Sequence, residues 1–304
     1  MSDRIAVIGE CMLELRTADR ASLTNTKPLD MGFGGDTLNT SIYMARAGMA
    51  PSYITALGDD ALSTWLLESW EQEGIACDQV VRMPNSVPGM YMINVDAQGE
   101  RSFLYWRKHS PASRLFDDLK RASDVFSMLR SFPTIYLSGI SLAILPEASR
   151  ERLIDFLVDY SRNRGAVLFD GNYRPALWQS PNAAQSVFQR LYGLSQIALP
   201  TYEDESDLFG YQSPAQAIDA ITEFGAREIV LKMGAEGCLA RSEAGTEIVP
   251  SIKTEAVDTT AAGDSFNAGF LAARLRGADI VSACQRGHEL ASRVIQHRGA
   301  IIPA

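Results

Sequence analysis

A run of small residues near the C-terminal end leads directly into an apolar helical pattern. It reads DTTAAGD from Asp258 to Asp264, and the helix is predicted over 263–275. Small side chains leave the first backbone N–H groups of a helix open, so we predict an anion site here. Asp264 could accept the proton of a hydroxyl group that attacks phosphorus, or it could simply cap the helix. The predicted anion hole consists of the amides of Ala261, Ala262 and Gly263.

A second glycine-rich segment, GFGGDTLN, runs from Gly32 to Asn39 and enters the first predicted helix. Two adjacent glycines allow a ligand to approach the backbone closely. Carboxylate and amide groups behind them supply acceptors and donors that suit a polyol. Glycine turns before helices are often purely structural, so this segment alone would carry little weight. Its candidate ligand-binding residues are Gly34, Gly35, Asp36 and Asn39.

Short apolar runs alternate with helical patterns along most of the chain. Such alternation predicts βαβ units on a parallel sheet, covered by helices on both faces. Two regions instead look extended, and one of them predicts a hairpin over 90–95 and 101–106 with a turn at 96–100. We therefore predict one α/β domain over 1–304, with a small β lid formed discontinuously by about 11–33 and 88–107. The predicted strands are 5–9, 53–57, 134–137, 166–169, 196–199 and 228–232, and the predicted helices are 38–47, 61–73, 146–163, 214–224, 263–275 and 280–296.

The composition argues against several classes of protein. The 304 residues include 28 Lys plus Arg and 37 Asp plus Glu, a net charge of −9, which disfavours binding to nucleic acid or an anionic membrane. No apolar run approaches the ~20 residues of a membrane span, and the N-terminus lacks a secretion pattern, so we expect a cytoplasmic protein. The four cysteines form no CxxC and the three histidines no HExxH, which predicts neither disulfides nor a zinc site.

The two glycine-containing segments together resemble the signatures of the ribokinase-like (PfkB) carbohydrate kinases. Gly34 and Gly35 with Asn39 match the first signature and 258–264 the second, in the same order along the chain. The resemblance implies a Rossmann-like core with a mostly parallel sheet, a small β lid and transfer of a phosphoryl group from ATP with Mg²⁺. A Rossmann dehydrogenase is disfavoured because 8–11 lacks GxGxxG after the first strand.

Further segments are similar to one subgroup of this family, the 2-keto-3-deoxygluconate kinases. The resemblance implies phosphorylation of this sugar acid at its C6 hydroxyl, a step of Entner–Doudoroff metabolism. Two alternatives remain open: a fructokinase- or ribokinase-like enzyme for another sugar, and a non-catalytic sugar-acid sensor on the same fold. The segments that carry the similarity are 8–12, 32–40, 137–145, 169–175 and 298–303.

Two arginines in aromatic surroundings fit an acidic sugar. Arg107 ends the proposed lid strand and Arg174 follows a core strand, where ligand loops of open α/β sheets lie. Guanidinium groups clamp carboxylates, so both could hold the acid end of the substrate while Asp264 serves the other end. The alternative is that both form ordinary surface ion pairs. The resemblance also implies that Tyr91 and Tyr105 face the substrate. For Tyr91, aromatic packing within the lid is an equally good explanation of the residue type.

For the nucleotide, the loop KMGAEG from Lys232 to Gly237 resembles the strand–KxGxxG loop of the family. By itself this pattern is more often a plain turn. Relatives often place a residue that contacts the nucleoside on the last helix, where His288 stands, although a single helical histidine is more often packed. The candidate nucleotide-binding residues are Asn172, Lys232, Gly234, Gly237 and His288, together with the amides of Ala261, Ala262 and Gly263.

The family's NxxE segment, which organises the Mg²⁺ shell, corresponds here to TYED from Thr201 to Asp204. Both ends differ from the family pattern, so Asp204 is the candidate metal residue and would act through water. The resemblance also implies a monovalent cation near Asp258 in many relatives, and a possible homo-oligomer through the apolar lid.

Overall fold

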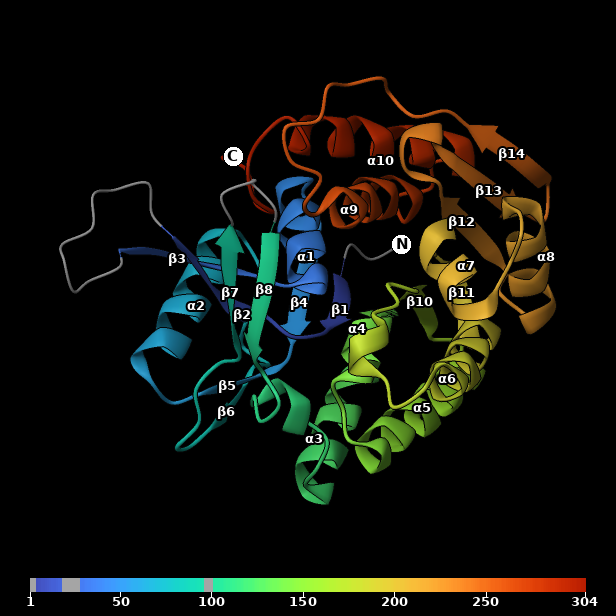
Figure 1. Cartoon of the computed structure of the whole chain (residues 1–304). Helices are drawn as coiled ribbons and strands as arrows, with labels where there is room; N and C mark the ends of the chain where they lie inside the picture. Colours follow the sequence, from blue (N-terminus) through green and yellow to red (C-terminus); the bar gives the residue numbers. More distant parts are fainter. Residues whose placement is uncertain (1–3, 18–27, 96–100) are drawn as a thin grey trace.

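An eight-stranded sheet forms the centre of the fold in the computed structural model, which describes residues 4–17, 28–95 and 101–304 (Figure 1). Six strands run parallel, and the last two join one edge antiparallel. Parallel strands buried on both faces need apolar residues throughout, as β1 shows with Ile-Ala-Val-Ile. The strand order is β14 (Gly245–Val249), β13 (Cys238–Ser242), β12 (Glu228–Lys232), β11 (Ser195–Ala198), β10 (Ala166–Asp170), β9 (Thr134–Ser138), β1 (Arg4–Ile8) and β4 (Ala50–Ile54).

Helices cover both faces of this sheet and create two apolar cores. Alternate residues of β1 separate them: Ile5 and Val7 belong to one core, and Ala6 and Ile8 belong to the other. The first core contains α1 (Asp36–Arg46), α2 (Ala61–Gln72), α9 (Ala262–Arg274) and α10 (Ile280–Val294). The second contains α3 (Leu119–Leu129), α4 (Gly139–Ala143), α5 (Glu147–Arg162), α6 (Pro181–Leu194), α7 (Tyr202–Phe209) and α8 (Pro214–Phe224).

A separate four-stranded sheet stands beside the core on the side of α1 and α2 (Figure 1). Strand β2 pairs antiparallel with β3 and parallel with β7, and β7 forms a hairpin with β8. The hairpin strands have the predicted bounds. The predicted turn at 96–100, and residues 18–27 of the predicted lid, lie outside the described residues. The strands are β2 (Met12–Thr17), β3 (Leu29–Gly34), β7 (Met90–Val95) and β8 (Arg101–Trp106).

Several element predictions need correction. The predicted strand 53–57 is two strands, since β4 ends at Ile54 and β5 (Ala56–Gly58) pairs with β6 (Val81–Met83) in a small sheet of its own. The first helix begins at Asp36, two residues before the predicted start. Helices α3, α4, α6 and α7 and strands β6, β13 and β14 were not predicted. Within the described residues, no helix has the length and apolar character to cross a membrane.

Candidate active site

The start of α9 lies beside the start of α1, and this contact brings the two glycine-rich segments together. Ala261 precedes α9 in the left-handed conformation, with φ 58° and ψ 20°, and no side chain caps the helix. A non-glycine residue in this region carries backbone strain of about 1–3 kcal/mol, a feature common at functional sites. The N–H of Ala262 donates to the Thr259 carbonyl at 3.2 Å, so the turn itself uses this part of the predicted anion hole.

Asp264 is held in the first turn of α9 by two residues of α1. Asn39 Nδ2 donates to Asp264 Oδ2 at 2.8 Å, and Thr40 Oγ1 donates to the Asp264 carbonyl at 3.2 Å. Burial and the nearby Asp36 carboxylate raise the pKa of Asp264 to about 7, while Asn39 and Lys232 oppose the shift. A carboxyl group with this pKa can exchange a proton with a hydroxyl group near neutral pH.

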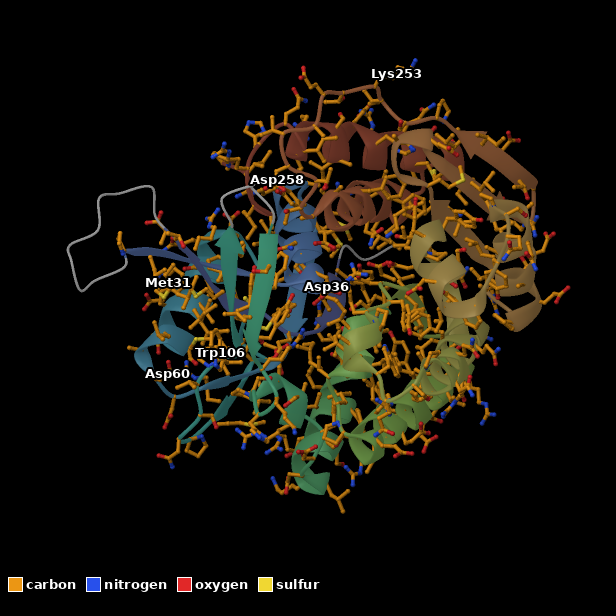
Figure 2. All side chains as sticks on the ribbon, viewed as in Figure 1. Met31, Asp36, Asp60, Trp106, Lys253 and Asp258 are labelled. Carbon is orange, nitrogen blue, oxygen red and sulfur yellow. The ribbon has the colours of Figure 1, made fainter. Side chains whose placement is uncertain are left out.

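The predicted polyol-binding residues lie at the start of α1, next to the loop after β10. Asn172 has φ 41° and its Nδ2 donates to Asp36 Oδ2 at 2.7 Å. Burial raises the pKa of Asp36, and hydrogen bonds from Ser138 and Asn172 partly offset this. Asn172, predicted to contact the nucleotide, therefore contacts a predicted sugar-binding residue in this structure. Figure 2 shows Asp36 near the middle of the molecule, between the small sheet and the larger core.

The small sheet presents two tyrosines to this region. Tyr91 and Tyr105 are direct cross-strand partners, with ring centroids 6.0 Å apart. The Tyr91 hydroxyl donates to Glu14, which is 8% exposed and also pairs with Arg16 at 2.9 Å. Burial and Glu14 raise the pKa of Tyr91. Sequence reasoning missed Glu14, because the alternation of 12–15 does not give the register that pairs Glu14 with Tyr91.

Both predicted carboxylate-binding arginines are ion-paired in the structure, but only the pair of Arg174 lies at the surface. Arg107 donates through Nη2 to Glu10, a pair in which the side chains are 14% and 1% exposed. Arg174 donates through Nη1 to both carboxylate oxygens of Asp204 at 3.2 Å. The side chains of this second pair are 51% and 23% exposed, so water can compete for it.

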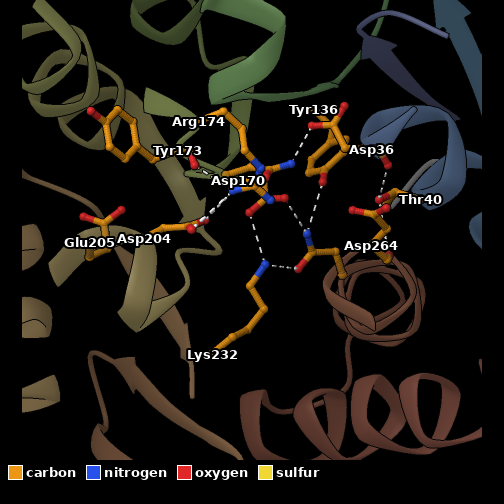
Figure 3. A network of polar contacts seen from close by, with 12 residues as sticks. Asp36, Thr40, Tyr136, Asp170, Tyr173, Arg174, Asp204, Glu205, Lys232 and Asp264 are labelled. Atoms are coloured by element: carbon orange, nitrogen blue, oxygen red, sulfur yellow. Dashed lines mark hydrogen bonds and ion pairs between the residues drawn. The ribbon is translucent and has the colours of Figure 1, made fainter. Parts of the chain in front are cut away.

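Lys232 lies where the polar network meets the start of α9 (Figure 3). Its Nζ is 3.1 Å from Asp170 Oδ1 and 3.1 Å from Asn267 Oδ1. A Cβ placed on Gly263 would be 3.7 Å from the same Nζ, so the ammonium group is next to the predicted anion hole. Asn267 also donates to Asp170 at 3.0 Å, which fixes the carboxylate. Because Lys232 is 8% exposed, the field of its ammonium group acts in a weakly screened environment.

A cavity of about 660 Å³ borders the predicted anion hole, because Lys232, Ala262 and Gly263 form part of its lining. Its volume is in the range of small-molecule and cofactor pockets. His288 forms part of the wall, packing edge-on against Phe266 with centroids 4.9 Å apart and contacting Cys238 Sγ at 3.6 Å. Ala261 and Asn172 are not among the lining residues. The predicted nucleotide residues that line the cavity are Lys232, Gly234, Gly237, Ala262, Gly263 and His288, and the unpredicted ones include Glu203, Ser251, Lys253, Thr254, Phe266, Ser292 and Ile295.

The donor set fits a metal ion that arrives with a nucleotide rather than a resident one. Among the described residues, no three His, Cys, Asp or Glu side chains converge to hold a metal. Burial raises the pKa of Asp204, which Arg174 and Lys232 partly offset. Mg²⁺ often uses one or two carboxylates and fills its other positions with water and phosphate oxygens, and Asp204 can supply such a ligand. Asp258, near which a monovalent cation was expected, accepts hydrogen bonds from the N–H groups of Thr260 and Gly299, both at 3.0 Å.

Comparisons with known proteins show the family of this chain. The family model described as "pfkB family carbohydrate kinase" matches residues 2–304. A 2-dehydro-3-deoxygluconokinase of Escherichia coli K12 is 45% identical over 314 residues, covering 100% of this chain and 98% of that protein. The crystal structure of a PfkB protein from Polaromonas sp. JS666 is similar with a TM-score of 0.84 and 27% identity, covering 97% and 96% of the two chains. A putative ribokinase II from E. coli in complex with ATP and Mg²⁺ shares the fold, with a TM-score of 0.83, 21% identity and coverage of 99% and 94%.

Proposed function

Because the chain belongs to the pfkB family of carbohydrate kinases, we propose that it phosphorylates 2-keto-3-deoxygluconate, also called 2-dehydro-3-deoxygluconate. The γ-phosphoryl group of ATP passes to the C6 hydroxyl, which gives 2-keto-3-deoxy-6-phosphogluconate and ADP. One observation supports the proposal: Asp264 is held by Asn39 of the glycine-rich segment, and the residue before it, Gly263, lines the nucleotide-sized cavity. The full-length similarity to a kinase of this sugar acid supports the choice of substrate.

Asp264 accepts the proton of the C6 hydroxyl as its oxygen attacks phosphorus. The carboxylate is held on one oxygen by Asn39, which leaves the other oxygen for the substrate. The amides at the start of α9 and the Lys232 ammonium group stabilise negative charge on the phosphoryl group during transfer. Closure of the small sheet over the sugar excludes water, which would otherwise accept the phosphoryl group.

The cavity beside α9 holds ATP, with Gly234 and Gly237 next to the phosphates and His288 in the wall. Mg²⁺ bound to ATP neutralises part of the triphosphate charge. Asp204 would supply a carboxylate to this ion through water. The proposal also includes a monovalent cation near Asp258. Because the reaction needs ATP, we assign it to the cytoplasm.

Arg107 and Arg174 bind the carboxylate end of the sugar acid. A substrate carboxylate at Arg174 would compete with Asp204, both of whose oxygens accept from Arg174 Nη1, so we expect this ion pair to open when the sugar acid binds. The half-exposed pair is weak enough to exchange. Its opening would release Asp204 toward the nucleotide, so sugar binding and metal binding would support each other.

A second candidate is a kinase for a neutral sugar, because both arginines already have carboxylate partners in this structure. An assay of ADP release across sugar acids and neutral sugars separates the two candidates. The proposal predicts turnover only with the sugar acid, and a loss of at least about tenfold in kcat/KM in Arg174→Ala. A matched control is Arg190→Ala, which removes an exposed ion pair to Glu151 that links α6 to α5. Equal turnover of a neutral hexose would favour the second candidate, and ATP binding without any turnover would favour a sensor.

The face of the small sheet opposite Tyr91 and Tyr105 is the site of a proposed homodimer contact. Four apolar residues form one cross-strand row on this face: Leu15 pairs with both Met31 and Met92, and Met92 pairs with Leu104. Met31 and Leu104 are 45% and 51% exposed. A second copy of the chain, which presents the same row, would cover this apolar surface.

A further inference from the structure

We propose that Glu10 is a positioning residue for recognition of the sugar acid: it holds the guanidinium group of Arg107 in the orientation that receives the substrate carboxylate. The inference rests on the proposed function, since it assigns a task to a residue behind the proposed carboxylate site. Glu10 follows β1 and is 3% exposed. One carboxylate oxygen accepts from Arg107 Nη2 and the other from the Ser110 hydroxyl.

Glu10 lies where the small sheet is joined to the core. The segment that contains it connects β1 with β2, and a Cβ on Gly35, which connects β3 with α1, would collide with the Glu10 carbonyl oxygen. A Cβ on Gly89, just before β7, would be 3.2 Å from Glu10 Oε1. Arg107 and Ser110 lie in the segment after β8. Glu10 therefore contacts each of the other segments that join the four described lid strands to the core.

The ion pair leaves Arg107 able to bind a second carboxylate. A guanidinium group carries five N–H donors, and the hydrogen bonds of Arg107 to the described residues use only Nη2. Its Nε is buried and has no hydrogen-bond partner in the part of the chain that the structure describes. Because Nε is buried, a ligand carboxylate would bind through the remaining N–H groups of the two terminal nitrogens. The pair with Glu10 thus fixes the side chain through Nη2, while Nη1 makes no hydrogen bond to the described residues.

The two arginines of the proposed site therefore have different tasks. Arg174 is paired at the surface and can move, as its side chain is 51% exposed. Arg107 is fixed, because its partner is almost fully buried and is itself held by Ser110. Ser110 is in turn part of a turn in which Ser113 Oγ donates to the Ser110 carbonyl at 2.8 Å. A prepositioned arginine loses less conformational freedom on binding, which favours a sugar with a carboxylate over one without.

A double-mutant cycle tests this role in the full-length enzyme. Glu10→Gln keeps the volume and removes the charge that orients Arg107. We expect KM for 2-keto-3-deoxygluconate to rise at least about tenfold, with kcat within about threefold and KM for ATP unchanged. Arg107→Ala should cause a similar rise, and the double variant should be no worse than the more severe single variant. Ser110→Ala, which leaves the carboxylate in place, should shift KM in the same direction by less.

Two controls separate this inference from the proposed function and from a merely structural role. Glu151→Gln removes an exposed carboxylate from an ion pair and should change neither KM nor kcat. 3-Deoxyglucosone, the aldehyde counterpart that lacks the carboxylate, should inhibit wild type and Glu10→Gln equally. Wild-type enzyme without activity on the acid would refute the proposed function. Active wild type with an unchanged or lower KM in Glu10→Gln, or additive effects with Arg107→Ala, would overturn the role of Glu10. If Glu10→Gln does not fold, Glu10→Asp and Ser110→Ala are measured in the same cycle and test the role of Glu10 by the same criteria.

Discussion

At the scale of single residues, the pKa of Asp264 is the property on which the chemistry depends. Its carboxyl group must be ionised to accept a proton, and its pKa is raised to about 7. We therefore expect kcat/KM for the sugar to fall as the pH drops below about 7, because the protonated fraction of Asp264 grows. The measurement is a pH profile of initial rates at low sugar concentration.

The neighbouring Asp36 gives this pH profile a sharper test. Its negative charge is one cause of the raised pKa of Asp264. Asp36→Asn removes that charge, so the acidic limb of the profile should move to lower pH, whatever happens to the absolute rate. A limb that stays in place or moves to higher pH would contradict the assignment of Asp264 as the group that titrates.

The proton-acceptor role itself predicts a separation of binding from turnover. Asp264→Asn keeps the size of the side chain and its contact with Asn39 but cannot accept a proton. We expect kcat to fall by ~10²–10⁴, with the sugar affinity measured by calorimetry changed only slightly. Near-normal turnover would remove Asp264 from the mechanism.

At the scale of elements, the glycine turn before α1 depends on close packing rather than on an unusual φ. Gly35 has φ 178°, which any residue adopts, but a Cβ there would collide with the Glu10 carbonyl. Gly35→Ala should therefore lower the free energy of unfolding by about 2 kcal/mol or more and weaken sugar binding. Gly32→Ala is the matched control, because its Cβ would meet only Arg16, at 4.0 Å. Urea unfolding of the two variants checks the difference, and equal stabilities would contradict it.

The sequence predicted these elements where the local pattern was strong. The hairpin strands β7 and β8 and the strand β12 have the predicted bounds, because alternation and apolar runs are local signals. Helix α4, with five residues, is too short to show a period. Helix α6 was not predicted, although Ser180 as its cap and proline in its first turn are start signals that the sequence contains.

For the candidate site, the sequence predicted individual residues but not the partners that the structure places beside them. The contact between Asn39 and Asp264 joins positions 225 residues apart, and the pair of Arg107 with Glu10 spans 97 residues. Such pairings follow from the packing of distant segments, which no spacing along the chain reveals. Glu10 and Glu14 were missed for this reason, since each contacts its partner, Arg107 or Tyr91, in another segment of the chain.

At the scale of the whole molecule, the apolar row on the small sheet predicts self-association. We expect a dimer in analytical ultracentrifugation, and Leu104→Glu should shift it to monomer because the row would then bury a charge. Ile248→Glu is a control of the same type on β14, where Ile248 is 72% exposed. A wild-type monomer at tens of micromolar protein, or an equal effect of both substitutions, would contradict the contact.

The most direct test of the central claim identifies the product and the position of its phosphate. Wild-type enzyme, Mg-ATP and 2-keto-3-deoxygluconate should give one phosphate ester, with phosphorus–proton coupling to the C6 protons in NMR. The same mixture with Asp264→Asn should show almost none of this ester over the same time. A phosphate at another oxygen, ATP consumption without an ester, or an equal yield from Asp264→Asn would contradict the account.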